Sequence, residues 1–208
     1  DDLMVIFNIK DDDNELALCL LKNRDGRLLS EYIHTLNGLN SETIEKIVEN
    51  GGWGSSAIAK CFDMFIDKIN SKIVDKLIEK QQAGCIVENL DKLKEIDQNE
   101  LVLKILKYGK ERSNNLQLVL NNLDKFGKLN SDVAVALLTE IKEHGLNFKN
   151  FTKNIDRFDK LDARVAGLLI DGDNHSYAYF HDNFSKFDSN SELALKIIET
   201  RDPYFVVK

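Results

Sequence analysis

The chain has 208 residues, of which 43% are hydrophobic and 30% are charged, and its formal net charge at pH 7 is −7. This apolar content excludes a disordered chain, and no apolar run approaches the roughly 18 residues that a membrane-spanning helix needs. The excess of 35 acidic over 28 basic residues disfavours a surface built to neutralise nucleic-acid phosphates. We therefore expect a soluble protein with no membrane span.

An eight-residue pattern recurs along the chain. A starter residue, usually polar, is followed by apolar residues at offsets two, three, six and seven, and successive starters are 27 to 32 residues apart. Periods of this length are typical of stacked repeat proteins. The copies read Asn14-ELALCLL, Ser41-ETIEKIV, Ser71-KIVDKLI, Asn99-ELVLKIL, Ser131-DVAVALL, Ala163-RVAGLLI and Ser191-ELALKII.

These offsets place the apolar residues on one face of an α-helix, so each copy predicts an amphipathic helix. The starters are mostly Ser or Asn, the residue types preferred at helix N-caps, and for the copy at Ala163 we expect Asp162 to be the cap. Glycines such as Gly51, Gly84 and Gly145 follow and predict where these helices end.

A second apolar stripe follows each turn, for example Val119, Leu123 and Phe126, and predicts a second helix that forms an antiparallel hairpin with the first. One hairpin buries too little apolar surface to be stable alone, so hairpins must stack. We predict an all-α protein, a right-handed α-solenoid of stacked antiparallel helical hairpins that forms a single repeat domain over residues 1–208. Residues 3–9 look like the end of an incomplete hairpin, so we expect the sequence to be an excerpt of a longer chain.

The recurring pattern resembles the broad class of α-solenoid repeats that includes HEAT-like, TPR-like and pentatricopeptide-like arrays, and this resemblance covers nearly the whole chain. The stretch Leu39-NSETIEKIVENGGWGSSAIAKCFDMF is also similar to the DNA-reading repeats of TAL effectors. The loops at corresponding places, such as Gln81-QAG and Asp171-GDNHS, differ from it in length and chemistry. The resemblance therefore implies a helical repeat architecture without a recurring base-reading position.

A polar motif closes the predicted second helices, in the forms Asn89-LDKL, Asn122-LDKF, Asn154-IDRF and Asn183-FSKF. Stacking would align its asparagines and its cations in rows, and two interpretations are open. The rows could grip an extended peptide, or the asparagines could satisfy backbone groups of neighbouring turns. The cations are Lys92, Lys125, Arg157 and Lys186, and the last residues of the motifs, predicted to be buried, are Leu93, Phe126, Phe158 and Phe187.

Trp53 is the only tryptophan and lies in the predicted loop Gly51-GWGSS. Tryptophan is enriched among the residues that dominate binding energy at protein interfaces. Trp53 is therefore a candidate contact residue if its ring is exposed; alternatively, the ring folds back over the turn.

The sequence contains no catalytic motif, and we predict neither an enzyme nor a cofactor. His175 and His181 are six residues apart, a spacing that does not place both rings on one helical face, so no metal site is predicted. Cys19, Cys61 and Cys85 are predicted to be buried, reduced thiols, which indicates a reducing compartment such as the cytoplasm.

The predicted function is a non-catalytic scaffold that binds a partner protein or peptide. The alternatives are a nucleic-acid-binding helical repeat protein, which the net charge disfavours, and the docking arm of a larger enzyme. The chain contains 20 Asn, and 22 Lys against 6 Arg, a bias typical of AT-rich coding sequence. This bias suggests a secreted bacterial effector that acts in the host cytosol.

Overall fold

The computed structural model describes residues 12–22, 26–108, 112–159, 161–172, 178–180 and 182–188. These residues form α-helices and short 3-10 helices, and among them there is no strand, so the predicted all-α class is confirmed. The chain divides into two compact units, Asp1–Ile96 and Asp97–Lys208. The finer prediction of a single right-handed solenoid stays a prediction.

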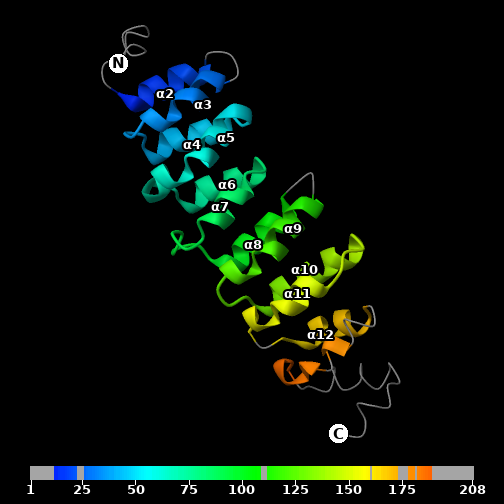
Figure 1. Ribbon diagram of the computed structural model, residues 1–208. Helices are drawn as coiled ribbons and strands as arrows, with labels where there is room; N and C mark the ends of the chain where they lie inside the picture. The colour runs from blue at the N-terminus through cyan, green and yellow to red at the C-terminus, as the bar shows by residue number, and fades with distance from the viewer. Residues whose placement is uncertain are drawn as a thin grey trace, which may run out of the picture. The chain divides into compact units, whose positions relative to one another are not determined.

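In the first unit, the helices of successive repeats pack against each other (Figure 1). Helix α2 contacts α4, α4 contacts α6, and α3 contacts α5. The elements are α2 (Asp13–Lys22), α3 (Arg27–Tyr32), η2 (Ile33–Thr35), α4 (Ser41–Glu49), α5 (Gly52–Lys60), η3 (Phe62–Lys68), α6 (Ser71–Glu79) and α7 (Ala83–Glu88).

The second unit repeats this scheme: α8 contacts α10, α10 contacts α12, and α9 contacts α11. A helix is thus confirmed at every predicted repeat start from Asn14 to Ala163, whereas the start at Ser191 lies outside the described residues. The elements are α8 (Gln98–Lys107), α9 (Arg112–Asn121), η4 (Leu123–Lys125), α10 (Ser131–Glu143), α11 (Lys149–Lys153), η5 (Ile155–Arg157), α12 (Ala163–Ile170) and η6 (Phe184–Lys186).

The apolar offsets of the repeat pattern form the core of each unit. In α6, the side chains of Ile73, Val74, Leu77 and Ile78 are all buried, and the corresponding residues of α8, α10 and α12 are buried as well. Full burial of one such side chain contributes roughly 1.5–3 kcal/mol. The stripes are therefore the main stabilising contribution of the repeat pattern.

The predicted N-caps are wrong by one or two residues, except at Asp162. In α4 the cap is Asn40, whose side chain accepts a hydrogen bond from the Thr43 amide at 2.8 Å. Asn70, Asn130 and Asp97 cap α6, α10 and α8 in the same way. Asp162 caps α12 as expected.

The starter residues bond instead to the following repeat. The Asn14 Oδ1 atom accepts a hydrogen bond from the Asn40 amide at 2.9 Å, and Asn99 Oδ1 accepts from the Asn130 amide at 2.8 Å. Ser131 Oγ accepts from the Asp162 amide at 3.1 Å. The polar start of a repeat thus holds the segment that leads into the next one.

A second link between repeats is a parallel backbone bridge in the second unit. The Leu129 amide donates to the Arg157 carbonyl, and the Asp159 amide donates to the Leu129 carbonyl, both at 2.8 Å. Leu161 forms the equivalent bridge to the next repeat: its amide donates to the Lys186 carbonyl at 2.9 Å, and its carbonyl accepts from the Asp188 amide at 2.7 Å. Both leucines are fully buried, so their peptide groups need such partners.

Glycine does not end every first helix. Gly145, with φ of 62°, follows α10, and the Leu146 amide donates to the Ile141 carbonyl at 2.9 Å, the bonding of a Schellman cap. After α6 the residue in this left-handed conformation is Gln81, with φ of 64°, whereas the predicted stop Gly84 lies inside α7.

Gly54 allows α4 and α5 to approach closely, because a methyl group at this position would lie 2.5 Å from the Ile47 carbonyl oxygen. We predict that Gly54→Ala lowers the free energy of unfolding by about 1–3 kcal/mol through this backbone clash. Gly84→Ala is the matched control, since a methyl group there meets nothing within 4 Å, and it should be neutral or stabilising. Urea unfolding of both variants tests this; equal midpoints would contradict the proposed clash.

Candidate functional site

The four motif asparagines each hold the end of a helical segment. The side-chain amides of Asn89, Asn122, Asn154 and Asn183 donate to the carbonyl four residues earlier, at 2.9, 2.8, 2.9 and 3.0 Å. One amide hydrogen of each residue thus satisfies a backbone carbonyl at the end of its helix. These bonds favour the structural interpretation, and a binding role of the asparagines stays a prediction.

The apolar ends of the same motifs are buried, as predicted. The exposed fractions are 6% for Leu93, 1% for Phe126, 5% for Phe158 and 2% for Phe187. The Phe158 ring lies 4.9 Å from the Phe151 ring, centroid to centroid, and the equivalent pair in the next repeat, Phe180 and Phe187, is 5.0 Å apart. Such pairs stabilise a core beyond the area that they bury.

The motif cations differ in their partners. Lys92 pairs with Asp63 and Lys186 pairs with Asp156, in both cases an aspartate of the preceding repeat. Lys125 and Arg157 are exposed and form no ion pair among the described residues. The row predicted from the sequence therefore contains two cations that link repeats and two that face solvent.

Arg157 lies in an open pocket of about 580 Å³ in the second unit. Lys128, Lys153 and Arg157 give the pocket three exposed cations, and Asp156 is its only acidic lining residue in the described chain. Gly127 and Asn154 complete the lining. We call this hollow the basic pocket.

Trp53 lies in the first turn of α5, so its predicted placement in a loop is wrong. Its side chain is 47% exposed, which is the condition for a contact residue. It adjoins the start of α3, because a methyl group at Gly26 would lie 3.6 Å from the Trp53 Cβ atom.

Three further large apolar side chains of the first unit are exposed: Leu28 and Tyr32 in α3, and Met64 in η3. Leu28 and Trp53 are each the second residue of their helix. Since α3 packs on α5, equivalent positions of neighbouring repeats present apolar side chains to solvent. We call Leu28, Tyr32, Trp53 and Met64 the apolar surface of unit 1.

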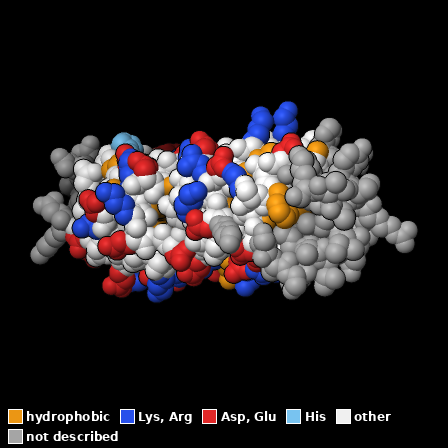
Figure 2. All heavy atoms as spheres, turned by 90° about the horizontal axis from the view of Figure 1, so that it is seen from below, with side chains coloured by type: hydrophobic (Ala, Val, Ile, Leu, Met, Phe, Trp, Pro, Cys, Tyr) orange, Lys and Arg blue, Asp and Glu red, His pale blue; other side chains and the backbone are white. Residues whose placement is uncertain are grey.

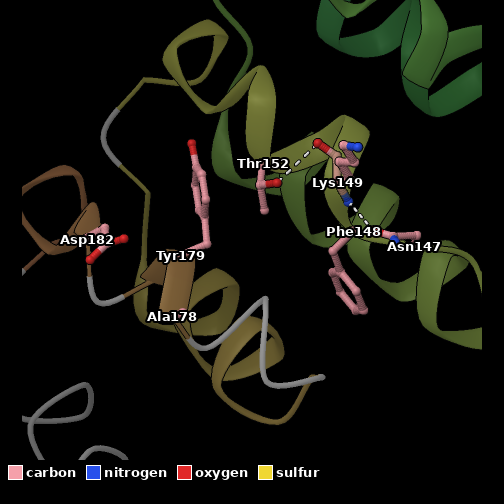
Figure 3. Close-up of a pocket in the computed structure, with 7 residues that line it drawn as sticks. All are labelled: Asn147, Phe148, Lys149, Thr152, Ala178, Tyr179 and Asp182. Carbon is pink, nitrogen blue, oxygen red and sulfur yellow. Dashed lines mark hydrogen bonds between the residues drawn. The ribbon is translucent and has the colours of Figure 1, made fainter.

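A cavity of about 480 Å³ lies in the second unit between α11 and the next repeat (Figure 3). Phe148 and Thr152 line one side, and Tyr179 and Asp182 line the other (Figure 3). Burial raises the pKa of the Tyr179 phenol. The opposite charges of Lys149 and Asp182 at its rim give this cavity no single ligand preference.

The three cysteines are free thiols and are half-buried rather than fully buried, which corrects that part of the prediction. Burial raises the pKa of the Cys61 thiol. Burial, together with the nearby negative charge of Glu88, raises the pKa of Cys85 to about 12, and its Sγ donates to the Gln82 carbonyl at 3.0 Å.

His175 and His181 lie outside the described residues. In the described part of the chain, no group of three or more His, Cys, Asp or Glu side chains is arranged to hold a metal ion. No helix of the described ranges has the length and apolar character that a membrane span requires.

Comparison with known proteins does not extend these observations. No protein-family model matches the chain, and no match was found among curated proteins or solved structures. The class that the fold defines is therefore an all-α protein, and its function has to be argued from its surfaces.

Sequence reasoning found Trp53 and Arg157 but missed the residues that surround them. Leu28 and Trp53 are each the second residue of the second helix in their hairpin. An alignment of the first turns of these helices would therefore have identified Leu28. Lys128 and Lys153 carry no motif of their own: the bridge at Leu129 brings Lys128 beside Arg157, whereas Lys153 directly precedes the motif that contains Arg157.

Asn122→Asp tests the structural bond of the motif asparagines. Aspartate has the same shape but cannot donate to the Leu118 carbonyl, so we expect a loss of about 1–2 kcal/mol in the free energy of unfolding. The control is Asn121→Asp. The Asn121 Oδ1 atom accepts a hydrogen bond from the side-chain amide of Asn150, and an aspartate at position 121 can still accept it. Denaturation followed by circular dichroism should show the larger shift for Asn122→Asp; the reverse order would refute the assignment.

The raised pKa of Cys85 predicts a poorly reactive thiol. At about pH 8 its thiolate fraction should be roughly a thousandfold below that of a thiol with the ordinary value of 9.0. Brief treatment of the folded chain with iodoacetamide should leave Cys85 unmodified, while the urea-unfolded chain reacts at all three cysteines. Peptide mass spectrometry gives the result, and rapid labelling of Cys85 in the folded chain would be inconsistent with its protection.

Proposed function

We propose that this protein is a non-catalytic interaction module that binds a partner protein. Its architecture in this proposal is a right-handed α-solenoid of stacked antiparallel hairpins. The packing of α2 on α4 and α4 on α6, and of α8 on α10 and α10 on α12, supports stacking within each unit. Such arrays offer extended surfaces on which contacts are spread over several repeats.

The observation that carries the proposal is the apolar surface of unit 1. The side chains of Trp53, Met64 and Leu28 are 47%, 45% and 39% exposed, although residues of these types are usually buried in a protein core. Their elements are packed in series, α3 on α5 and α5 on η3, and exposed apolar side chains on packed elements are candidates for a protein-binding site. Tryptophan and tyrosine are also well suited to be anchors, since they bury a large area and retain a polar group.

The occupant that we propose is an amphipathic segment of a different protein. Charges of both signs border the apolar residues: Arg27 and Glu31 on α3 form an exposed ion pair at 3.3 Å. An apolar centre with a charged rim fits a partner helix that has the complementary pattern. Four apolar side chains are few for a stable dimer of this chain, whose interface would comprise about 20–30 residues on each side.

Charge distribution supports a protein partner over nucleic acid. On the face drawn in Figure 2, acidic side chains stand among the basic ones, whereas a phosphate-binding surface needs a continuous positive stripe. The placement in a reducing compartment, as a bacterial effector in the host cytosol, belongs to the same proposal. Its support is the three free thiols and the Asn-rich, Lys-rich composition.

Trp53→Ala tests the proposed function. Because about half of the Trp53 side chain is already exposed, the variant should still fold, with a loss of at most about 3 kcal/mol in the free energy of unfolding, but it should bind the partner at least about tenfold more weakly. Proteins from a host or native lysate would be captured on the immobilised chain, and binding of the purified partner would then be measured. Tyr108→Ala is the control, because Tyr108 is 38% exposed in the second unit.

The proposal requires proteins that the wild type and Tyr108→Ala retain and Trp53→Ala loses. Equal retention by all three chains would refute it. Light scattering after size exclusion adds a second criterion: a concentration-dependent dimer that Trp53→Ala abolishes would assign the apolar surface to a second copy of this chain instead.

A further inference from the structure

We propose that the basic pocket binds an acidic segment of the partner protein, with two neighbouring carboxylate side chains held by Lys128, Lys153 and Arg157. This inference rests on the proposed function, because it specifies the chemistry of the partner. It concerns a different surface from the one that carries Trp53, so the two can fail separately.

The pocket has a positive charge that its own repeat contacts do not neutralise. Among the described residues, neither Lys153 nor Arg157 forms an ion pair, and the Lys128 Nζ atom donates to the Asp156 carbonyl oxygen at 2.6 Å. The Asp156 carboxylate pairs with Lys186 of the next repeat. Three cations therefore face one open pocket whose single carboxylate already has a partner.

The backbone that carries these cations is fixed before any ligand binds. The bridge between Leu129 and residues 157–159 joins the segment next to Lys128 directly to the segment that contains Arg157. Asn154 is fixed by its own bond to the Asn150 carbonyl at 2.9 Å. A preorganised site of this kind loses little conformational entropy when a ligand binds.

The donors suit carboxylates on a peptide. The planar guanidinium of Arg157 can bind both oxygens of one carboxylate, and the ammonium groups of Lys128 and Lys153 can reach a second one. The remaining amide hydrogen of Asn154, the other having been used within its helix, can donate to a peptide carbonyl. The pocket thus recognises adjacent acidic side chains together with their main chain.

The flanking residues favour a peptide over a nucleic-acid strand. Asp156 and Asp159 are exposed and flank Arg157 in the sequence. A strand carries a phosphate at every nucleotide and would meet these carboxylates along its path. A short acidic segment can place its charges in the pocket alone.

The test uses the full chain and fluorescein-labelled hexaglutamate, with fluorescence polarisation at low ionic strength. We expect saturable binding that weakens as salt is added. The double variant Lys153→Gln with Arg157→Gln should bind about tenfold more weakly, because it removes two of the three charge contacts. Lys107→Gln with Lys142→Gln changes the net charge equally at exposed positions outside the pocket and should stay within about twofold of the wild type.

Three results would overturn the assignment: no saturable binding by the wild type, equal weakening in both double variants, or tighter binding of single-stranded oligo-dT that only the pocket variant loses. The last result would assign the pocket to nucleic acid. Trp53→Ala separates this inference from the proposed function, because it should leave hexaglutamate binding unchanged. Loss of the partner in Trp53→Ala without any hexaglutamate binding by the wild type would refute the basic pocket alone.

Discussion

In the second unit, the packing of successive hairpins depends on how the buried peptide groups between them are satisfied. In the segment that joins two hairpins, Leu129 is buried although its neighbours are exposed, and its peptide groups form no helical hydrogen bonds. The following repeat supplies the partners: Leu129 is fully buried and bonds through both its amide and its carbonyl to residues 157–159. Leu161 repeats the arrangement one hairpin later. Because these bonds join backbone groups, they fix the spacing of neighbouring hairpins independently of the identity of the exposed side chains.

This constraint explains why the motif that closes each second helix is so regular. Its asparagine satisfies a carbonyl at the helix end, and its last residue, leucine or phenylalanine, fills the core. At Arg157 and Lys186 in the second unit, the carbonyl of the cation itself accepts the bridging bond. The charged group of the motif's Lys or Arg takes no part in these backbone and core contacts. Lys186 uses its charge to link repeats, whereas that of Arg157 faces an open pocket. The two cations thus make the same backbone contact but differ in the partner of their side chain.

Residue periodicity predicted the helices because a buried stripe follows directly from the 3.6-residue turn. The same reasoning misplaced the N-caps. Asn14, Asn99 and Ser131 use their polar side chains to accept hydrogen bonds from the next repeat, and the sequence around each residue does not reveal such a distant partner. Gly84 failed as a helix stop because Gln81 adopts the left-handed conformation instead. The basic pocket was missed for a related reason: Lys128 and Arg157 are distant in sequence, and only tertiary contacts, such as the bridge at Leu129, bring them together.

The two surfaces differ in the physics by which they would bind. Burial of Trp53 and its apolar neighbours is insensitive to salt and supplies affinity, whereas the charges of the basic pocket act over a Debye length and mainly govern orientation and association rate. In the proposed complex, an amphipathic helix of the partner contacts the apolar surface of unit 1 and an acidic segment contacts the basic pocket, each with its own salt dependence. In this complex, added salt would weaken the contact of the acidic segment, mainly by slowing its association, while the apolar contact persisted. Salt dependence therefore measures the share of the binding energy that belongs to the basic pocket.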